Sequence, residues 1–432
     1  MRATFTIENT SVFKRKLLTF LQREPIYALY NSNDFYKDKD LSSRPYYHSH
    51  DLLCAFGVKR EIIADNEAFF DKLIYARKTQ SWLFGFLGYD LKNEVEDLQS
   101  NNYDGTEMPD AYFFEPETVL LLNENQLTIS TQSIFSPIDI WKSISEADEL
   151  EIQANKNPIK LKNRLSKAEY ISNVEKLKNH IVEGDIYEVN FCQEFYAEDA
   201  EIHPEQLFAR INQLSPQPFS GLLKLQDKYV ICASMERFLK KEGNKLISQP
   251  IKGTIRRGKT PEEDLELQKQ LAEDEKERAE NIMIVDLVRN DLARSSQSGS
   301  VKVEELCGVY DFPLVHQMIS TVTSTLRPEI PYINAIKNAF PMGSMTGAPK
   351  VRTMQLIEEY EKTKRGLYSG AIGYFAPDDD FDFNVVIRSF IYNQAKKYLS
   401  LHVGSAITFD SDAEREFEEC QMKIRGLLRA LE

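Results

Sequence analysis

The sequence predicts a mixed α/β protein of the α+β kind, in which strands outnumber the helices that could cross between them. Short apolar or aromatic runs bounded by turn residues recur along the whole chain, and longer amphipathic or charged segments with helix-capping residues lie among them. The two kinds of segment do not alternate regularly. A repeating βαβ arrangement is therefore not expected.

The first part of the chain is predicted to be a separate region that is rich in strands. Strand-like runs occur at residues 27–30, 82–89 and 119–122. The polar, lysine-rich stretch 146–163 contains Pro158 and is typical of a connector. The sequence thus divides into an N-terminal region, residues 1–155, and a second region, residues 156–432, and no catalytic motif lies in the first.

The second region has clearer helix and strand signals. Ser166 and Glu169 form a capping-box sequence, which predicts a helix that runs to about Val182 and stops at Gly184. Further strands are expected at residues 186–191, 221–225, 229–233, 301–303, 316–326, 370–375, 383–392 and 398–403. Further helices are expected at residues 261–294, 332–339, 350–360 and 412–431, with a Gly/Pro loop at 341–349.

Composition narrows the class of protein. The chain has 432 residues, 42% of them hydrophobic, which is enough for a large core. Its formal net charge of −14 would repel a phosphate backbone, so we expect no nucleic-acid partner. The five cysteines include no CxxC pair, and no apolar run is long enough to cross a bilayer. We therefore expect a cytoplasmic protein without a membrane partner.

Three charged residues share one face of the last predicted helix. Glu416, Glu419 and Lys423 follow the spacing i, i+3, i+7, whereas the apolar residues of this helix lie on another face. Such a charged face is usually solvated surface. From the spacing alone, the surface interpretation is favoured over a functional one.

Glu280 lies in a more apolar setting, since it shares a helix face with Ile284 and Leu287. A carboxylate that loses hydration needs a partner, and oxygen donors from two helices would suit Mg²⁺. An ion pair with Arg278 or Arg289 would satisfy it equally well. Both interpretations stay open on this evidence.

Two Gly-containing segments could carry other chemistry. The loop at 343–350 leads into a helix, whose N-terminal amides could hold an anion, but its spacing does not match a Walker motif. Lys252 lies in the segment Pro250-Ile-Lys-Gly-Thr254, at a strand end beside a glycine. Most lysines are exposed, so the spacing alone gives no reason to assign Lys252 a catalytic role.

Taken together, these segments resemble the chorismate-utilising enzymes. The matching strings, in the order of the family, are SMERF at 234–238, PIKGT at 250–254, RAENIMIVDLVRNDLAR at 278–294, GSMTGAPKVR at 343–352, YSGAIGYF at 368–375, VVIRSF at 385–390 and EREFEECQMK at 414–423. The first region also resembles the N-terminal part of the synthase subunits of this family, through WLFGFLGYDLKNEVEDL at 82–98.

This resemblance implies a fold and a set of site residues. The fold is α/β, with two large β-sheets packed face to face and helices outside, so the two regions would be one intertwined fold. The implied substrate is chorismate and the implied cofactor is Mg²⁺. The residues carried over are Glu280, Glu416 and Glu419 for the metal, Thr346, Tyr368, Arg388, Gly404 and Lys423 for the substrate, and Glu236 as general acid.

Lys252 indicates which branch of the family the chain resembles. Enzymes that form anthranilate usually have a small residue here, whereas those that form 4-amino-4-deoxychorismate have a lysine that adds covalently to the ring. For that step the amine must be neutral, which requires a pKa lowered by about 3 units, from burial with a neighbouring Mg²⁺ or arginine. The anthranilate branch with an atypical lysine, and a non-catalytic binding protein, are the alternatives.

Glu188 argues against water as the nucleophile. The water-adding members resemble this chain around residues 184–190 but have a lysine base where this chain has Glu188. Ammonia is therefore the expected nucleophile. The sequence contains no Gly-x-Cys-x-Gly elbow, so the resemblance implies a separate glutamine amidotransferase subunit as partner.

The chain departs from the family pattern at several places, among them the turn Gly404-Ser405-Ala406 and Ser234-Met235, which stands where the family usually has Ser-Pro. Much of the family has a histidine three residues before Ser320, where this chain has Gln317, and His316 lies one residue earlier. Either His316 reaches the site or the site works without an imidazole. The N-terminal Leu-Leu-Glu-Ser signature of tryptophan-binding anthranilate synthases is also missing, which argues against feedback by tryptophan.

Overall fold

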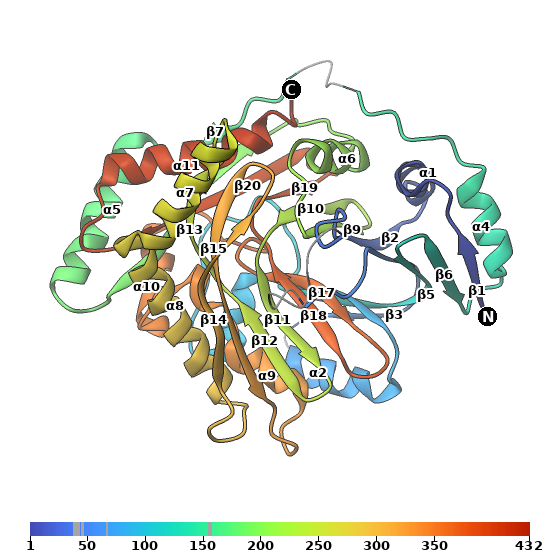
Figure 1. Cartoon of the computed structure of the whole chain (residues 1–432), viewed down its shortest axis with the longest axis horizontal. Helices are drawn as coiled ribbons and strands as arrows, with labels where there is room; N and C mark the ends of the chain where they lie inside the picture. The colour runs from blue at the N-terminus through green and yellow to red at the C-terminus, as the bar shows by residue number, and fades with distance from the viewer. Residues whose placement is uncertain (38–43, 45–46, 66–67, 154–157) are drawn as a thin grey trace.

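The computed structural model describes residues 1–37, 44, 47–65, 68–153 and 158–432. Every strand pairing in this part of the chain that joins two named strands is antiparallel, which agrees with the absence of a βαβ repeat. No helix in the described ranges is long and apolar enough to span a membrane. Figure 1 shows a central body of strands with helices around it.

The strands have the following bounds. They are β1 (Arg2–Thr6), β2 (Ile26–Asn31), β3 (Leu52–Ile63), β4 (Leu83–Leu87), β5 (Ala111–Asn123), β6 (Gln126–Thr131), β7 (Lys162–Asn163), β8 (Glu188–Ala197), β9 (Phe219–Leu225), β10 (Lys228–Ser234), β11 (Arg237–Glu242), β12 (Lys245–Gln249), β13 (Ile251–Arg256), β14 (Lys302–Asp311), β15 (Val315–Thr325), β16 (Gly347–Ala348), β17 (Ala371–Phe375), β18 (Phe381–Val385), β19 (Ser389–Asn393) and β20 (Tyr398–Ile407).

The helices have the following bounds. They are α1 (Thr10–Leu21), α2 (Phe69–Ala76), α3 (Lys92–Val95), α4 (Pro137–Ser145), α5 (Lys167–Val182), α6 (Pro204–Leu214), α7 (Pro261–Glu273), α8 (Glu275–Ala293), α9 (Tyr332–Ala339), α10 (Lys350–Tyr360) and α11 (Ala413–Leu428), with 3-10 turns at Arg77–Thr79, Tyr89–Leu91 and Gly343–Met345.

The strand network divides into two sheets that share β5. The second half of β5 pairs with β6, and its first half pairs with β4, while β3 runs along its other side. One sheet continues from β3 through β2, β9, β10, β19 and β20 to β8. The other continues from β4 through β17, β18, β11 and β12 to β15, which also pairs with β13 and β14.

The two sheets pack face to face, as the resemblance implied. One buried cluster contains apolar side chains of β2, β3, β9 and β10 together with those of β4 and β17. The Tyr30 hydroxyl on β2 donates a hydrogen bond to the Gly373 carbonyl on β17, over 2.9 Å. Gly221 lies at the same contact, because a Cβ there would lie 2.8 Å from Ile372. These contacts between β2, β9 and β17 hold the two sheets against each other.

Helices cover the outer faces of both sheets. The core on the outside of the first sheet includes residues of α1, α4, α5, α6, α10 and α11. The core on the outside of the second sheet includes residues of α2, α8 and α9. In Figure 1, α11 and α5 lie together on one side of the molecule, and α8 runs beside β14 and β15.

Two predicted elements are each broken in the structure. The single helix expected at 261–294 is two helices, because Asp274 leaves the helical conformation and its side chain accepts a hydrogen bond from the Glu277 amide to begin α8. The single strand expected at 383–392 is interrupted between β18 and β19, where Arg388 has a φ of 53°. The first break lies six residues before Glu280, and the second lies at Arg388, which the resemblance assigns to the substrate.

The expected boundary between residues 155 and 156 lies outside the described residues. Strands from the two regions nevertheless pair with each other: β2 pairs with β9, and β4 pairs with β17. Neither sheet is therefore completed by one region alone.

Candidate active site

Lys252 lies where the far edges of the two sheets approach each other. The register of β13 against β15 shifts between Ile251 and Thr254, and Gly253 has a φ of 98°. Glycine adopts this conformation without the strain that a side chain would impose. The Lys252 amine forms an ion pair with Glu188, the first residue of β8, over 2.8 Å between Nζ and Oε1. Glu188 is buried, with a side-chain exposure of 1%.

The electrostatic surroundings of Lys252 differ from those that the chemistry was expected to require. Burial lowers the pKa of the amine, but the carboxylates of Glu188, Glu280 and Glu236 together raise it above its ordinary value. From the sequence, we expected burial together with a neighbouring arginine or metal ion to lower the pKa of the Lys252 amine. Here the protein's own groups around the amine are anionic, so they stabilise the ammonium form.

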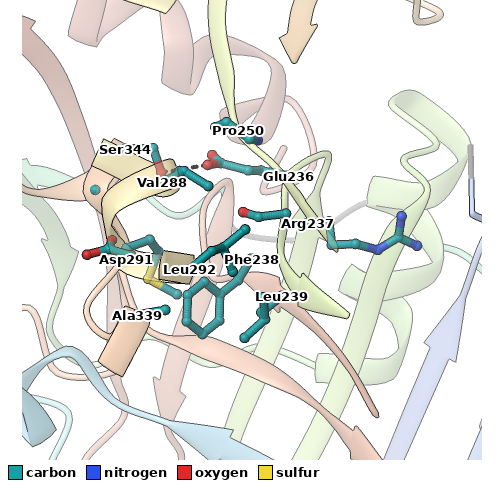
Figure 2. Close-up of a pocket in the computed structure, with 13 residues that line it drawn as sticks. Glu236, Arg237, Phe238, Leu239, Pro250, Val288, Asp291, Leu292, Ala339 and Ser344 are labelled. Atoms are coloured by element: carbon teal, nitrogen blue, oxygen red, sulfur yellow. Dashed lines mark hydrogen bonds between the residues drawn. The ribbon is translucent and has the colours of Figure 1, made fainter. Parts of the chain in front are cut away.

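Glu236, the residue directly before β11, is the proposed general acid. Ser344 donates a hydrogen bond from its hydroxyl to Glu236 Oε1 over 2.6 Å, as Figure 2 shows. Burial raises the pKa of Glu236 to about 7, although Ser344 and Lys252 oppose the shift. A cavity of about 20 Å³ lies beside it, between β11, α8 and the loop at 342–344. That volume is enough for about one water molecule. A carboxyl group with such a pKa can donate a proton near neutral pH.

The carboxylates predicted to hold a metal come from two helices. Burial raises the pKa of Glu280 on α8 to about 7, and burial with Glu419 raises the pKa of Glu416 on α11. The pKa of Glu419 is lowered by Lys423, whose amine lies 2.5 Å from it, despite burial. Lys276 pairs with Glu280 over 3.7 Å, and it also interacts electrostatically with Glu416 and Glu419 on α11.

Sequence reasoning missed Glu277, which belongs to the same group of carboxylates. It precedes Glu280 by three residues, so it shares that face of α8, and burial raises its pKa. A Cβ at Gly253 would lie 3.2 Å from Glu277 Oε2, which places this carboxylate next to the Lys252 segment. The spacing i, i+3 was the signal that could have found it.

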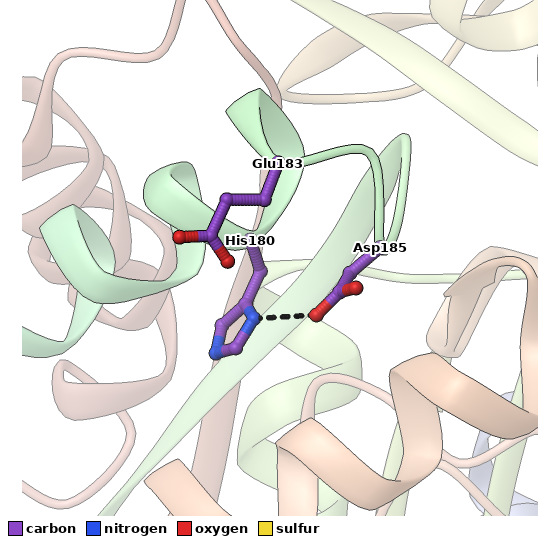
Figure 3. Close-up of side chains that lie close together, drawn as sticks. All are labelled: His180, Glu183 and Asp185. Carbon is purple, nitrogen blue, oxygen red and sulfur yellow. Dashed lines mark hydrogen bonds and ion pairs between the residues drawn. The ribbon is translucent and has the colours of Figure 1, made fainter.

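The oxygen donors of this group suit Mg²⁺, which binds carboxylates and retains water. However, these carboxylates do not form a compact group of donor atoms in the structure. In the described part of the chain, the one group of three or more His, Cys, Asp or Glu residues with donor atoms within 4.8 Å of one another is His180, Glu183 and Asp185 (Figure 3). In this cluster, His180 Nδ1 forms a hydrogen bond with Asp185 over 2.8 Å, and His180 Nε2 forms one with the Tyr360 hydroxyl over 3.1 Å. Both ring nitrogens therefore already have partners. That cluster fastens the end of α5 to α10.

The predicted substrate-binding residues gather around β20 and α11. The Lys423 amine donates to the Gly404 carbonyl over 3.0 Å, and the Arg388 guanidinium donates to the Lys423 carbonyl. Burial lowers the pKa of Arg388, which interacts electrostatically with Tyr368 and Glu419. A side chain at position 404 would displace a neighbour on β8, because a Cβ there would lie 2.4 Å from Cys192 Sγ.

Thr346 joins this group to the Lys252 side of the site. It is fully buried, and its carbonyl accepts a hydrogen bond from the Asn190 amide over 2.8 Å. The next two residues form β16, which pairs with the beginning of β8 and places Ala348 opposite Glu188. All ten predicted site residues thus lie in one connected region, built from β8, β13, β16, β20, α8 and α11 together with the segments at 236, 368 and 388.

His316 does not replace the family histidine. Its ring bonds to Asp311 over 2.8 Å and to Asp264 over 3.0 Å, so it packs against α7. Gln317 takes the position of the missing histidine, and its Oε1 accepts a hydrogen bond from Thr254, two residues after Lys252. Neither nitrogen of His316 is left for a substrate.

Comparison with known proteins identifies the family. Residues 45–429 match the family described as chorismate binding enzyme. The chain belongs to the chorismate-binding enzymes. This chorismate-binding enzyme is 34% identical to aminodeoxychorismate synthase component 1 of Bacillus subtilis over 366 residues, which cover 82% of this chain and 77% of that protein. It is 33% identical to anthranilate synthase component 1 of Acetivibrio thermocellus over 370 residues, which cover 81% and 74%.

A solved structure supports the fold of the family. Anthranilate synthase component I from Streptococcus pneumoniae superimposes with a TM-score of 0.77 at 26% sequence identity, covering 91% of this chain and 96% of that one. The α/β architecture implied by the resemblance is thereby confirmed. Relatives of both the aminodeoxychorismate and the anthranilate type are similar at nearly the same identity, so overall likeness does not choose between these two activities.

Proposed function

We propose that this chorismate-binding enzyme is a component I of aminodeoxychorismate synthase, which converts chorismate and ammonia to 4-amino-4-deoxychorismate for the synthesis of para-aminobenzoate and folate. The observation that carries the proposal is Lys252, in the segment PIKGT, with its amine held by the buried Glu188 at 2.8 Å. A lysine held inside a site, beside an acid with a pKa of about 7, is suited to covalent catalysis.

Lys252 and Glu236 have complementary roles in the proposed reaction. The Lys252 amine adds to ring carbon 2 while Glu236 protonates the 4-hydroxyl, which leaves as water. Ammonia then adds to carbon 4 and expels the lysine, and the surplus proton of the new ammonium group returns to Glu236. The pyruvyl ether stays attached, so a separate lyase must act on the product.

The proposal includes Mg²⁺, which Glu280 and Glu419 would hold with Glu416. Bound there, the cation would neutralise the ring carboxylate of chorismate. Arg388, Tyr368 and Lys423 are proposed to orient the substrate carboxylates, Thr346 to contact the reacting end, and the backbone at Gly404 to approach the ligand. The electrostatic contact of Arg388 with Tyr368 and Glu419 supports this grouping.

The ammonia is proposed to come from a separate glutamine amidotransferase subunit. The names of the relatives, which are component 1 of aminodeoxychorismate or anthranilate synthase, support a second component. A cytoplasmic location is part of the same proposal, and the five unpaired cysteines, all of them buried, are consistent with a reducing compartment.

Anthranilate synthase component I is the second candidate. The observation in its favour is the similarity to the Acetivibrio thermocellus and Streptococcus pneumoniae proteins. The two activities differ in the fate of the side chain, because anthranilate formation releases pyruvate and aminodeoxychorismate formation does not.

Two substitutions test the covalent role of Lys252. In Lys252→Ala and Lys252→Arg, we expect ammonia-dependent consumption of chorismate to fall by at least about a thousandfold, since neither side chain can act as the nucleophile. Lys252→Arg keeps the positive charge beside Glu188 and controls for loss of the ion pair. If Lys252→Ala still formed the amino product at the wild-type rate and gave no anthranilate, Lys252 would have no covalent role.

A further inference from the structure

The proposed function leaves one proton unexplained. Lys252 must lose a proton before its nitrogen can attack the ring, yet the groups around it favour the ammonium form. An acceptor for that proton must lie within hydrogen-bond reach of the amine. In the described part of the chain, the Lys252 amine has one hydrogen-bond partner, Glu188 Oε1 at 2.8 Å.

Only one of the two oxygens of the Glu188 carboxylate has a hydrogen-bond partner among the described residues, and that partner is the Lys252 amine. The second oxygen, Oε2, is buried without a hydrogen-bond donor among the described residues. Both side chains of the pair are largely removed from solvent, with exposures of 13% for Lys252 and 1% for Glu188, and their polar atoms face each other over 2.8 Å. The geometry and the burial therefore prepare the pair for proton transfer.

The other carboxylates near Lys252 have different partners. Glu236 comes from the segment before β11 and bonds to Ser344, and the reaction needs its own proton for the leaving hydroxyl. Glu280 on α8 pairs with Lys276. Glu277 and Glu419 also interact electrostatically with Lys252, but Glu419 pairs with Lys423. Within the described residues, none of these four carboxylates forms a hydrogen bond with the Lys252 amine, so Glu188 is the acceptor in position.

We propose that Glu188 is the positioning residue that accepts the proton of Lys252, an inference that rests on the proposed function. The N–H bond breaks toward the Glu188 carboxylate, and the lone pair of the nitrogen forms the bond to ring carbon 2. The ring double bond shifts, and the C4–O bond breaks as Glu236 donates its proton and water leaves. When ammonia expels the lysine, Glu188 returns its proton to the amine, so both carboxyl groups end as they began.

Glu188→Gln tests this assignment with two independent readouts. Glutamine keeps a hydrogen-bond acceptor for Lys252 but cannot take up the proton. The first readout is the pH at which the Lys252 peptide becomes half labelled by an amine-reactive reagent, followed by mass spectrometry. The second is the pH profile of ammonia-dependent turnover. We expect labelling to shift to lower pH, because an anion has been removed, and turnover at pH 7.5 to fall at least about tenfold and to recover as the pH rises.

In Glu188→Gln, easier labelling of Lys252 together with slower turnover is expected only if Glu188 takes the proton. If Glu188 merely held the ammonium in place, the larger neutral fraction in Glu188→Gln would leave turnover unchanged or increase it, and that result would overturn the proposal. Glu188→Asp keeps a base and is expected to retain the wild-type pH profile at a reduced rate. If the pH profile of turnover in Glu188→Asp resembled that of Glu188→Gln instead of the wild type, that result would also count against the proposal.

A matched control separates this role from the effect of altering any buried carboxylate. Glu205 on α6 is 4% exposed and accepts a hydrogen bond from Tyr27 over 2.7 Å, far from Lys252 in the sequence. Glu205→Gln is expected to have the wild-type pH profile. An inactive Lys252→Ala with an unimpaired Glu188→Gln would reject the proton-acceptor role and leave the proposed function standing, whereas an active Lys252→Ala would reject both.

Discussion

At the scale of single residues, the burial of Glu236 couples the chemistry to stability. Its pKa is about 7 in the folded chain and near 4.5 when exposed. Between these values the folded chain binds a proton that the unfolded chain has lost, so the free energy of unfolding falls as the pH rises through this window. The total loss is about 3 kcal/mol, at 1.36 kcal/mol per pKa unit.

Glu236→Gln removes that dependence. Because glutamine has no titrating proton, the stability of the variant relative to the wild type should increase by about 3 kcal/mol between pH 4.5 and pH 8. Urea denaturation at the two pH values measures the difference, and Glu236→Gln keeps an acceptor for the Ser344 hydroxyl. Equal changes of stability with pH in the two proteins would contradict a pKa of about 7.

The residues themselves could be selected from the sequence, but their environments could not. The motif around Lys252 was recognisable, whereas its pairing with Glu188 joins two strands that are 64 residues apart in the chain. No local pattern encodes such a contact. The same holds for Ser344, which bonds to Glu236 across 108 residues. Glu277 is different, since its spacing from Glu280 on one helix face was visible in the sequence.

At the scale of elements, the proposed metal site depends on α8 and α11 together. Each helix supplies carboxylates, and Lys276 and Lys423 now offset part of their charge. We expect Glu280→Gln and Glu419→Gln to weaken Mg²⁺ binding by at least about tenfold in calorimetric titration, because each removes an anionic oxygen ligand. Glu273→Gln, at the exposed end of α7, is the control and should bind Mg²⁺ as the wild type does. Equal affinities in all four proteins would place the metal elsewhere.

Helix boundaries were predictable where a side chain marks them. The capping box of Ser166 and Glu169 begins α5 as expected, with Ser166 and Glu169 bonding to each other's backbone amides. The break between α7 and α8 was missed because the charged residues on both sides favour helix equally, and only the capping bond of Asp274 separates them. The break at Arg388 was missed because apolar residues continue on both sides of it.

At the scale of the whole molecule, the two regions of the chain are proposed to fold as one unit. The contact β4–β17 and the contact β2–β9 each join a strand before residue 155 to a strand after it, and the cluster between the sheets contains side chains from both regions. We expect residues 1–153 and 158–432, produced separately, to be unfolded or aggregated, and to form a cooperative fold only when produced together. A stable, cooperatively unfolding 158–432 fragment would show that the second region is an independent domain.

The topology of the sheets was beyond what local patterns predict. Individual strands such as β2 and β10 followed from their apolar runs, but the division of β5 between two sheets depends on partners from distant parts of the chain. The resemblance supplied the face-to-face arrangement, and the packing of Tyr30 and Gly221 against β17 confirms it.

The proposed function requires that this chorismate-binding enzyme adds ammonia to chorismate through Lys252 and keeps the pyruvyl group. The decisive experiment is mass spectrometry of the products that the purified chain forms from chorismate, Mg²⁺ and ammonium at mildly alkaline pH. We expect an amino product with pyruvate still attached from the wild type, and no such product from Lys252→Ala. Anthranilate with free pyruvate would contradict the proposed function and assign the chain to the anthranilate branch, and unchanged chorismate would favour a non-catalytic protein or one that requires its partner subunit.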